Sequence, residues 1–166
     1  MKKLLEIGEI VKPQGIKGEV KLVPYMDKLN AYKSLKRVII DGQQKEIVGA
    51  RHDGSGVFLL LKGVNDRNTA ETYRKKIVSI PIEEAEPFRE GYFIVELEGL
   101  NVFVGDKPVG VLDQVLKTGS VDVFSVKGDR PFMTPFLKKL VIEVNLSDGK
   151  IVFDPKVFEE VVCYED

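Results

Sequence analysis

The chain has 166 residues, of which 43% are hydrophobic and 31% are charged. This composition is ordinary for a soluble globular protein, and the length allows one domain or two small ones. No apolar run approaches the roughly 20 residues that cross a bilayer, so we expect no membrane span. Charged residues directly after Met1 argue against a signal peptide, and a single cysteine, Cys163, fits a reducing compartment. We therefore expect a cytoplasmic protein.

The net charge of −1 conceals a difference between the two halves of the chain. Residues 1–90 carry 17 Lys+Arg and 13 Asp+Glu, a net charge of +4, whereas residues 91–166 carry 8 and 13, a net charge of −5. A basic half followed by an acidic half indicates two different partners, one of which could be anionic. Two differently solvated surfaces explain the same numbers, because modest charge asymmetry informs on partners only weakly.

The first half reads as a series of short strands around one helix. Apolar residues that run or alternate between turn residues predict strands over 4–11, 18–23, 37–41, 45–51, 57–62 and 77–82. A helix is predicted over 67–76, capped by Asn65 or Asp66. Its acidic residues come early and its basic residues late, as the helix dipole favours.

An acidic stretch over 83–91, which contains Pro87 and Gly91, is the predicted linker between a first domain (1–84) and a second domain (91–166). Strands are predicted in the second half over 92–97, 101–104, 109–116, 121–126, 132–136, 140–146 and 150–153, with a hairpin signature at 147–149. Short strands between regularly spaced turn signals indicate barrels or sandwiches. We therefore predict a mostly-β fold of two small β-barrels joined by a short linker.

The sequence contains no recognisable catalytic constellation. The one histidine, His52, is expected to be an exposed turn residue, and Cys163 a small buried one. No phosphate-binding loop occurs, and the paired carboxylates lie in the predicted linker or tail, where solvation explains them. We expect no catalytic residues, no metal ligands and no cofactor.

The segment Gly15-Ile16-Lys17-Gly18 matches the GxxG pattern by which KH domains grip RNA phosphates. In that fold the loop joins two helices, whereas strands are predicted on both sides here. The glycines are therefore better explained as turn residues between antiparallel strands. Lys12, Lys17 and Lys21 cluster around this turn. A basic hairpin tip could contact a phosphate backbone, and a merely solvated tip fits the charge equally well.

A specific resemblance begins at the same turn. Residues 7–21 (IGEIVKPQGIKGEVK) resemble the opening signature of the RimM family, in which a glycine-bearing strand leads into a His-Gly-Ile/Leu-Lys-Gly-Glu turn. Gln14 stands where the family often has histidine. Residues 66–71 (DRNTAE) resemble the start of the family's helix. The candidate RNA-contacting residues are Lys12, Gln14, Lys17 and Lys21, with the basic helix residues Arg67, Arg74, Lys75 and Lys76 as the alternative surface.

The resemblance continues through the second half. Residues 92–100 (YFIVELEGL) resemble the family segment YYxxDLiGL, with Phe93 for the second tyrosine and Glu96 for the aspartate. Residues 109–113, 119–123 and 135–136 extend the match in order, so it spans nearly the whole chain.

This resemblance implies an N-terminal six-stranded barrel similar to those of translation factors and a C-terminal PRC-type barrel. It implies a non-catalytic, monomeric factor that binds the head of the free 30S subunit through ribosomal protein number nineteen and assists 16S rRNA processing and late assembly. Two alternatives remain open: a generic RNA-binding module that acts outside the ribosome, and an enzyme, since similar barrels occur in flavin reductases.

Tyr92 and Phe93 are the candidate partner-binding residues. In a strand over 92–97, neighbouring side chains point to opposite faces. Phe93 then shares an apolar row with Val95 and Leu97, so we predict that Phe93 lies in the core. Tyr92 is predicted on the outer face, where it could bind the ribosomal protein or merely cover the linker.

Overall fold

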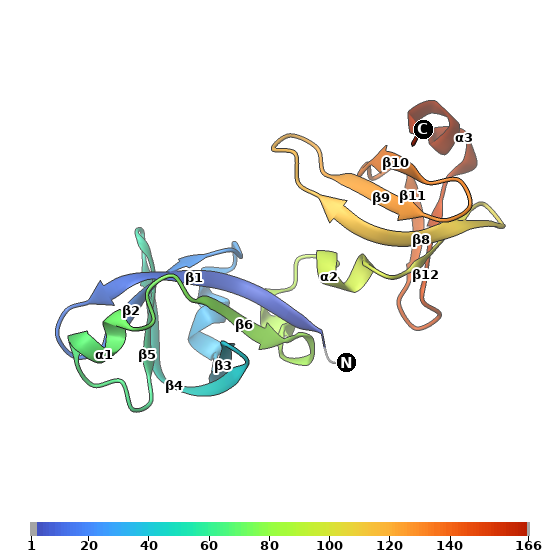
Figure 1. Cartoon of the computed structure of the whole chain (residues 1–166). Coiled ribbons are helices and arrows are strands. Elements are labelled where there is room, and N and C mark those ends of the chain that lie inside the picture. Colours follow the sequence, from blue (N-terminus) through green and yellow to red (C-terminus); the bar gives the residue numbers. More distant parts are fainter. Residues whose placement is uncertain (1–2, 166) are drawn as a thin grey trace. The chain divides into compact units, whose positions relative to one another are not determined.

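The computed structural model describes residues 3–165, which form two compact units, one ending at Glu90 and the other beginning at Gly91 (Figure 1). Strands dominate both units, and helices are few and short. The predicted mostly-β fold class is thereby confirmed.

The first unit is a closed antiparallel barrel of six strands in the order β1-β2-β5-β4-β3-β6. All six predicted strands are present, with ends that differ by a few residues. They are β1 (Leu4–Gln14), β2 (Glu19–Pro24), β3 (Arg37–Ile40), β4 (Gln43–Asp53), β5 (Gly56–Leu61) and β6 (Ile77–Pro81).

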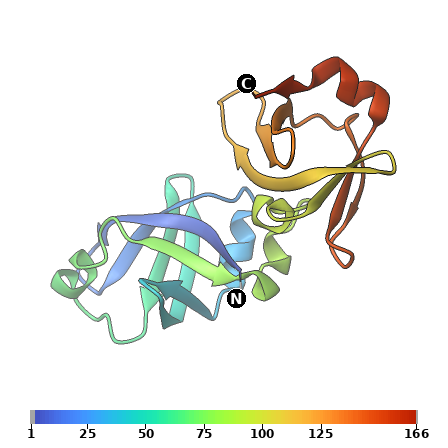
Figure 2. The ribbon, with the colours of Figure 1, turned by 45° about the vertical axis from the view of Figure 1, so that its right-hand side comes forward.

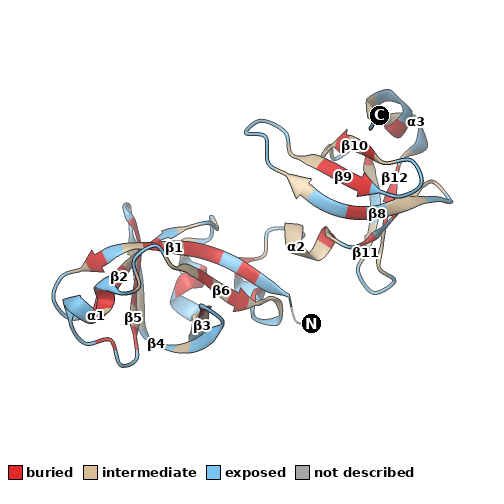
Figure 3. Cartoon of the chain, viewed as in Figure 1, coloured by how far each residue is buried: buried red, intermediate tan, exposed pale blue. Residues whose placement is uncertain are grey.

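Aliphatic side chains from alternating strand positions fill the barrel interior. Buried and exposed positions follow one another along its strands in Figure 3. On β2, Val20 and Leu22 are fully buried, while Lys21 between them points outward. On β5, Val57 and Leu59 are inside as well, while Phe58 between them is buried beneath the guanidinium of Arg51. This alternation places the charged residues of the first unit on the outer surface of the barrel.

A buried tyrosine ties the segment after β6 to the barrel. Tyr32, on the 3₁₀ helix η1 (Leu29–Ser34), donates its hydroxyl to the carbonyl oxygen of Ile7 at 2.6 Å, and burial raises the pKa of this hydroxyl to about 12. Its ring meets Phe88 edge-on, with ring centres 4.8 Å apart. Phe88 and Ala85 are buried in and beside the 3₁₀ helices η2 (Ile82–Glu84) and η3 (Glu86–Phe88). Much of the predicted linker is therefore packed structure.

Helix α1 (Arg67–Glu71) is shorter than predicted. Of the two expected caps, Asp66 is the one used. Its carboxylate accepts the N–H of Thr69 at 2.7 Å, and this hydrogen bond lowers the pKa of Asp66 below its ordinary value. The helix gives way to turns, and Lys75 has a φ of +70° and donates its N–H to Ile10. The chain thus leaves the helix before Lys75 and Lys76, whose backbone groups both bond to Ile10 on β1.

The second unit consists of a strongly curved seven-stranded sheet and two helices, α2 (Ile94–Leu97) and α3 (Pro155–Val161); Figure 2 shows α3 beside β10. The sheet order is β11-β12-β7-β8-β9-β10-β13, with β12 and β7 parallel. Its core contains Phe124, Phe132, Phe153 and Phe158. The strands are β7 (Asn101–Val104), β8 (Lys107–Leu116), β9 (Val123–Lys127), β10 (Phe132–Pro135), β11 (Val141–Asn145), β12 (Lys150–Phe153) and β13 (Cys163–Tyr164).

Two expectations for the second unit are wrong, and one helix was missed. The predicted strand over 92–97 is instead the short helix α2, whose start is closed by a hydrogen bond from the N–H of Phe93 to the Glu96 carboxylate at 2.9 Å. Helix α3 was not predicted; the carboxylate of Asp154 caps it by accepting the first two free N–H groups of the helix. Cys163 is exposed rather than buried, because it lies on the edge strand β13.

We expect a glutamate-specific endoprotease to cut the native chain after Glu90 in preference to Glu83, Glu84 or Glu86. Glu90 lies at the division between the units, whereas the other three belong to the segment anchored by Ala85 and Phe88. Mass spectrometry of early fragments would measure the order of cuts. Earlier cleavage after Glu83, Glu84 or Glu86 than after Glu90 would contradict this placement of the domain boundary.

Candidate nucleic-acid interface

The hairpin formed by β1 and β2 carries all four predicted RNA-contacting residues. Lys12 and Gln14 lie on β1, Lys17 lies in the connecting turn, and Lys21 lies on β2. Lys12 stands directly opposite Lys21 in the strand ladder, and Gln14 stands opposite Glu19. The structure therefore brings these side chains together on one end of the hairpin.

The strand register extends this basic surface across four strands. Lys21 is opposite Phe58 on β5, and Phe58 is opposite Arg51 on β4, so Lys12, Lys21, Phe58 and Arg51 form one row across the barrel. The Arg51 guanidinium lies 4.2 Å from the centre of the Phe58 ring. It also donates two hydrogen bonds, of 2.7 and 3.0 Å, to the carboxylate of Glu19. We call these four residues the basic row.

Sequence reasoning did not single out Arg51, since only the strand register shows that it continues the line of Lys12 and Lys21.

The three lysines of the hairpin are not neutralised within the described part of the chain. Among residues 3–165, neither Lys12, Lys17 nor Lys21 forms an ion pair with a carboxylate. Like charges directly opposite each other in a ladder destabilise a sheet, and Lys12 and Lys21 are such a pair. An anion bound between them would relieve this repulsion, so the free hairpin favours an anionic partner.

The alternative basic surface, on and after α1, is largely committed to contacts within the barrel. Arg67 donates to the carbonyl oxygen of Gly15 at 3.0 Å, and Arg74 donates to that of Val11 at 2.9 Å. Arg74 also pairs with Glu71, and Lys76 pairs with Asp41 at 2.7 Å. Arg67 and Arg74 thus hold the hairpin in place. Lys75 is exposed and makes no ion pair among residues 3–165, so this surface offers one available cation where the hairpin offers three lysines.

The GxxG segment is a turn between two antiparallel strands, as predicted, and not a KH loop. Gly15 and Gly18 have φ values of +72° and +102°, which favour glycine. Gly18 also lies so close to Val64 that an added Cβ would overlap the Val64 carbonyl oxygen and stand 2.7 Å from its carbonyl carbon. A shallow depression beside the turn is lined by Gln14, Gly15, Ile16, Lys17, Glu19, Arg51 and Leu60.

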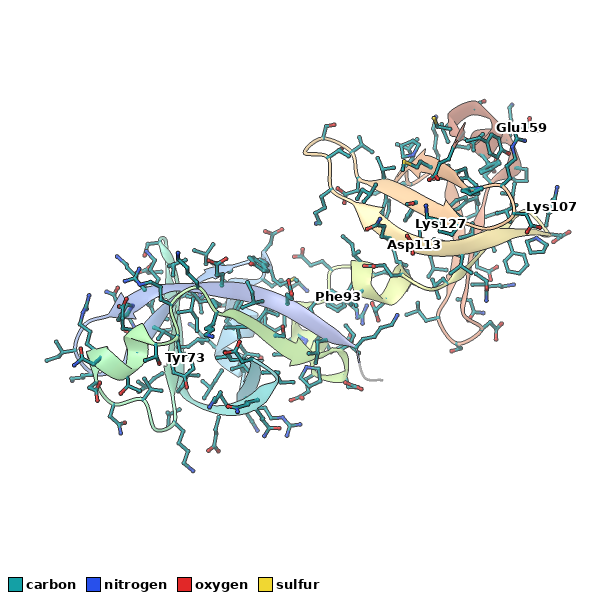
Figure 4. All side chains as sticks on the ribbon, viewed as in Figure 1. Tyr73, Phe93, Lys107, Asp113, Lys127 and Glu159 are labelled. Atoms are coloured by element: carbon teal, nitrogen blue, oxygen red, sulfur yellow. The ribbon has the colours of Figure 1, made fainter. Side chains whose placement is uncertain are left out.

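The two candidate protein-binding residues lie at the start of the second unit. Tyr92 is 54% exposed and Phe93, labelled in Figure 4, is 8% exposed. Their opposite burial agrees with the prediction, but the reason differs, because Phe93 directly precedes a helix and does not alternate along a strand. Tyr92 is thus available on the surface, while Phe93 is buried.

Neither a metal site nor a membrane-spanning helix is evident among residues 3–165. His52 lies on β4 rather than in a turn and is half-buried, with a ring nitrogen 2.9 Å from the side-chain oxygen of Asn30. No group of three or more His, Cys, Asp or Glu side chains in this part of the chain could bind a metal ion. None of its helices has the length and apolar character needed to cross a membrane.

Comparison with known proteins assigns both units. Residues 5–85 match the RimM N-terminal domain, and residues 94–158 match the RimM PRC barrel domain. A ribosome maturation factor RimM from Clostridium botulinum (strain ATCC 19397 / Type A) is 36% identical over 157 residues, which cover 93% of this chain and 96% of that protein. The corresponding protein from Desulfitobacterium hafniense is 38% identical over 150 residues, covering 87% and 88%.

A solved structure of a 16S ribosomal RNA processing protein RimM from Pseudomonas aeruginosa is 33% identical, covers 92% of this chain and 97% of that chain, and has a TM-score of 0.47. The fold and the comparisons together define a two-domain protein in which a RimM-type barrel precedes a PRC barrel domain. The chain belongs to the RimM family.

We expect Gly18→Ala to destabilise the first unit much more than Gly15→Ala. Both positions have positive φ, which costs an alanine about 1–2 kcal/mol. Only at Gly18 does the new Cβ also meet backbone atoms, those of Val64, whereas nothing lies within 4 Å at Gly15. Urea denaturation would measure the free energies of unfolding, and equal losses for the two variants would contradict the close contact between Gly18 and Val64.

Proposed function

We propose that this protein is a non-catalytic, monomeric ribosome maturation factor of the cytoplasm. It binds the head of the free 30S subunit through ribosomal protein number nineteen, and assists 16S rRNA processing and late assembly. The observation that carries this proposal is the family match across both units, with relatives that bear the name ribosome maturation factor. The unneutralised lysines of the β1–β2 hairpin support an RNA contact by the first unit.

The two units divide the work in this proposal. Lys12, Gln14, Lys17 and Lys21 contact the rRNA backbone, because an RNA surface supplies the anions that these lysines lack within the protein. Tyr92 contacts the ribosomal protein, because a large, exposed aromatic side chain is a common anchor of protein interfaces. The net charges of +4 and −5 in the two halves agree with one anionic and one cationic partner.

Co-sedimentation tests the proposal directly. The full-length protein is mixed with free small subunits, free large subunits and intact ribosomes, and we expect it to pellet with free small subunits alone. Equal binding to all three would indicate a generic RNA-binding module. No binding to small subunits, under conditions in which naked RNA is bound, would place its action outside the ribosome.

We expect the triple substitution of Lys12, Lys17 and Lys21 by glutamine to weaken binding to small subunits and to make it less sensitive to salt. Each phosphate contact contributes about 0.9 to the slope of log affinity against log salt, so the slope should fall by roughly 2–3. Titrations at several salt concentrations measure this slope.

Replacement of Lys33, Lys36 and Lys45 by glutamine is the matched control, since it removes the same charge elsewhere on the first unit. An unchanged slope in the hairpin variant, or the same decrease in the control, would move the RNA contact away from the hairpin.

We expect Tyr92→Ala and Phe93→Ala to fail in different ways. Tyr92 is exposed, so its loss should change stability by no more than about 0.5 kcal/mol, yet weaken binding to the isolated ribosomal protein by about thirtyfold. Phe93 is buried, so its truncation should cost about 3 kcal/mol of stability. Melting curves and titrations measure both effects. Normal binding by Tyr92→Ala would rule out its role as an anchor.

A further inference from the structure

Ile16, in the turn of the β1–β2 hairpin, is the most exposed large hydrophobic residue among residues 3–165. The side chain of Ile16 is 78% exposed, compared with 64% for Val48 on the outside of β4 and 45% for Val23 on β2. Isolated exposed apolar residues are common and need no explanation by themselves. Ile16 differs because it lies in the turn next to Lys17 and lines the same depression as Gln14 and Arg51.

The turn that presents Ile16 is held by two contacts with the rest of the barrel. Arg67 donates a hydrogen bond of 3.0 Å to the carbonyl oxygen of Gly15, the residue directly before Ile16. Gly18, two residues after it, is in close contact with the backbone of Val64. Gly15 and Gly18 both have the positive φ that the tight turn needs. A turn restrained in this way presents its apolar side chain with little further loss of conformational entropy on binding.

We propose that Ile16 is an apolar wedge that packs against the sugars and base edges of an RNA minor groove, and that Arg67 is its positioning residue. The inference rests on the proposed function, which it deepens by naming how the hairpin contacts RNA. The minor groove of an RNA helix is wide and shallow, so a short hairpin tip can reach its floor. Isoleucine is among the residues that proteins insert between base steps in DNA minor grooves, so its side chain is suited to contact with base edges.

The charges around Ile16 favour RNA over a protein as the occupant. Lys17 adjoins it in the chain, and Lys12 and Lys21 stand opposite each other on the flanking strands, with no ion pair to any of the three within residues 3–165. Phosphates flank both sides of an RNA minor groove, so an apolar tip with cations behind it matches that surface. A protein surface would have to supply several carboxylates in the same arrangement.

Salt titrations with free small subunits distinguish the contribution of Ile16 to binding from the contribution of the lysines. Ile16→Ser should bind about tenfold more weakly at every salt concentration with an unchanged slope, because an apolar contact releases no counterions. Val48→Ser, the matched control, should bind like the wild type. Unchanged affinity of Ile16→Ser would overturn the wedge. Failure of the wild-type chain to bind small subunits would instead contradict the proposed function, so the two failures are distinguishable.

A double-mutant cycle tests the positioning role of Arg67. Arg67→Lys keeps the charge but loses the geometry of the hydrogen bond to Gly15, so it should weaken binding severalfold without a change in slope. Combined with Ile16→Ser it should add no further loss, because Arg67 acts through Ile16. Additive losses would show that Arg67 contacts the RNA by itself or supports the fold, and melting curves of all variants would identify the latter.

Photo-crosslinking distinguishes RNA from protein at the tip. Cys163 is exposed, so it is first replaced in the variant Cys163→Ser. Ile16→Cys in this background is then labelled with an aryl azide and bound to small subunits at a concentration above the dissociation constant. We expect a crosslink to 16S rRNA from position 16 and none from Val48→Cys. A crosslink from position 16 to a ribosomal protein alone would overturn the RNA assignment.

Discussion

The contact between Gly18 and the backbone of Val64 brings the turn of the β1–β2 hairpin against the loop that precedes α1. At this distance no side chain larger than hydrogen fits, and the φ of +102° independently favours glycine. The turn fixes the strand register, and that register places Lys12 opposite Lys21 and aligns both with Phe58 and Arg51. A slip of one residue would reverse the two faces of β2 and turn Lys21 into the barrel interior.

Arginine and lysine have different tasks on this barrel. Arg67 and Arg74 donate directionally to carbonyl oxygens of β1 and its turn, and Arg51 forms a two-pronged pair with Glu19. The planar guanidinium suits such fixed geometry. The hairpin lysines make no ion pair within residues 3–165, and their compact, flexible charges suit contacts with phosphates whose positions vary. The same surface therefore combines a rigid frame of arginines with adjustable lysines.

The sequence predicts the strands of the first unit well, because each strand has one face toward the barrel interior and one toward solvent. Apolar and polar residues therefore alternate along it. It also places Lys12, Lys17 and Lys21 together, since residues that flank a tight turn must lie close in space. The position of Arg51 in line with Lys12 and Lys21 depends on the pairing of β2 with β5 and of β5 with β4, which local sequence patterns do not specify. The same limit applies to Phe88, whose burial against Tyr32 is a long-range contact within an acidic segment.

At the start of the second unit, local sequence patterns predicted the wrong type of secondary structure. Phe93, Val95 and Leu97 form the apolar row that one buried face of a strand would have, and a four-residue helix is too short to show a helical period. The hydrogen bond from Phe93 to Glu96 decides the outcome, and a Glu three residues after the cap position was its only visible signal. For α3 the pair Asp154-Pro155 was a recognisable start, because aspartate caps helices and proline fits their first turn.

Under the proposed function, the arrangement of two contacts on two units has an energetic consequence. A hairpin that contacts RNA through three lysines binds weakly at physiological salt and does not distinguish one RNA sequence from another. An aromatic anchor on the second unit is likewise a small interface. Joined in one chain, the second contact forms at a high effective concentration once the first is made, so their free energies combine only where both partners are within reach. Each contact can therefore be weak enough for the protein to dissociate from the subunit. The two contacts together still favour a subunit that carries both the RNA and the ribosomal protein over free RNA or free ribosomal protein.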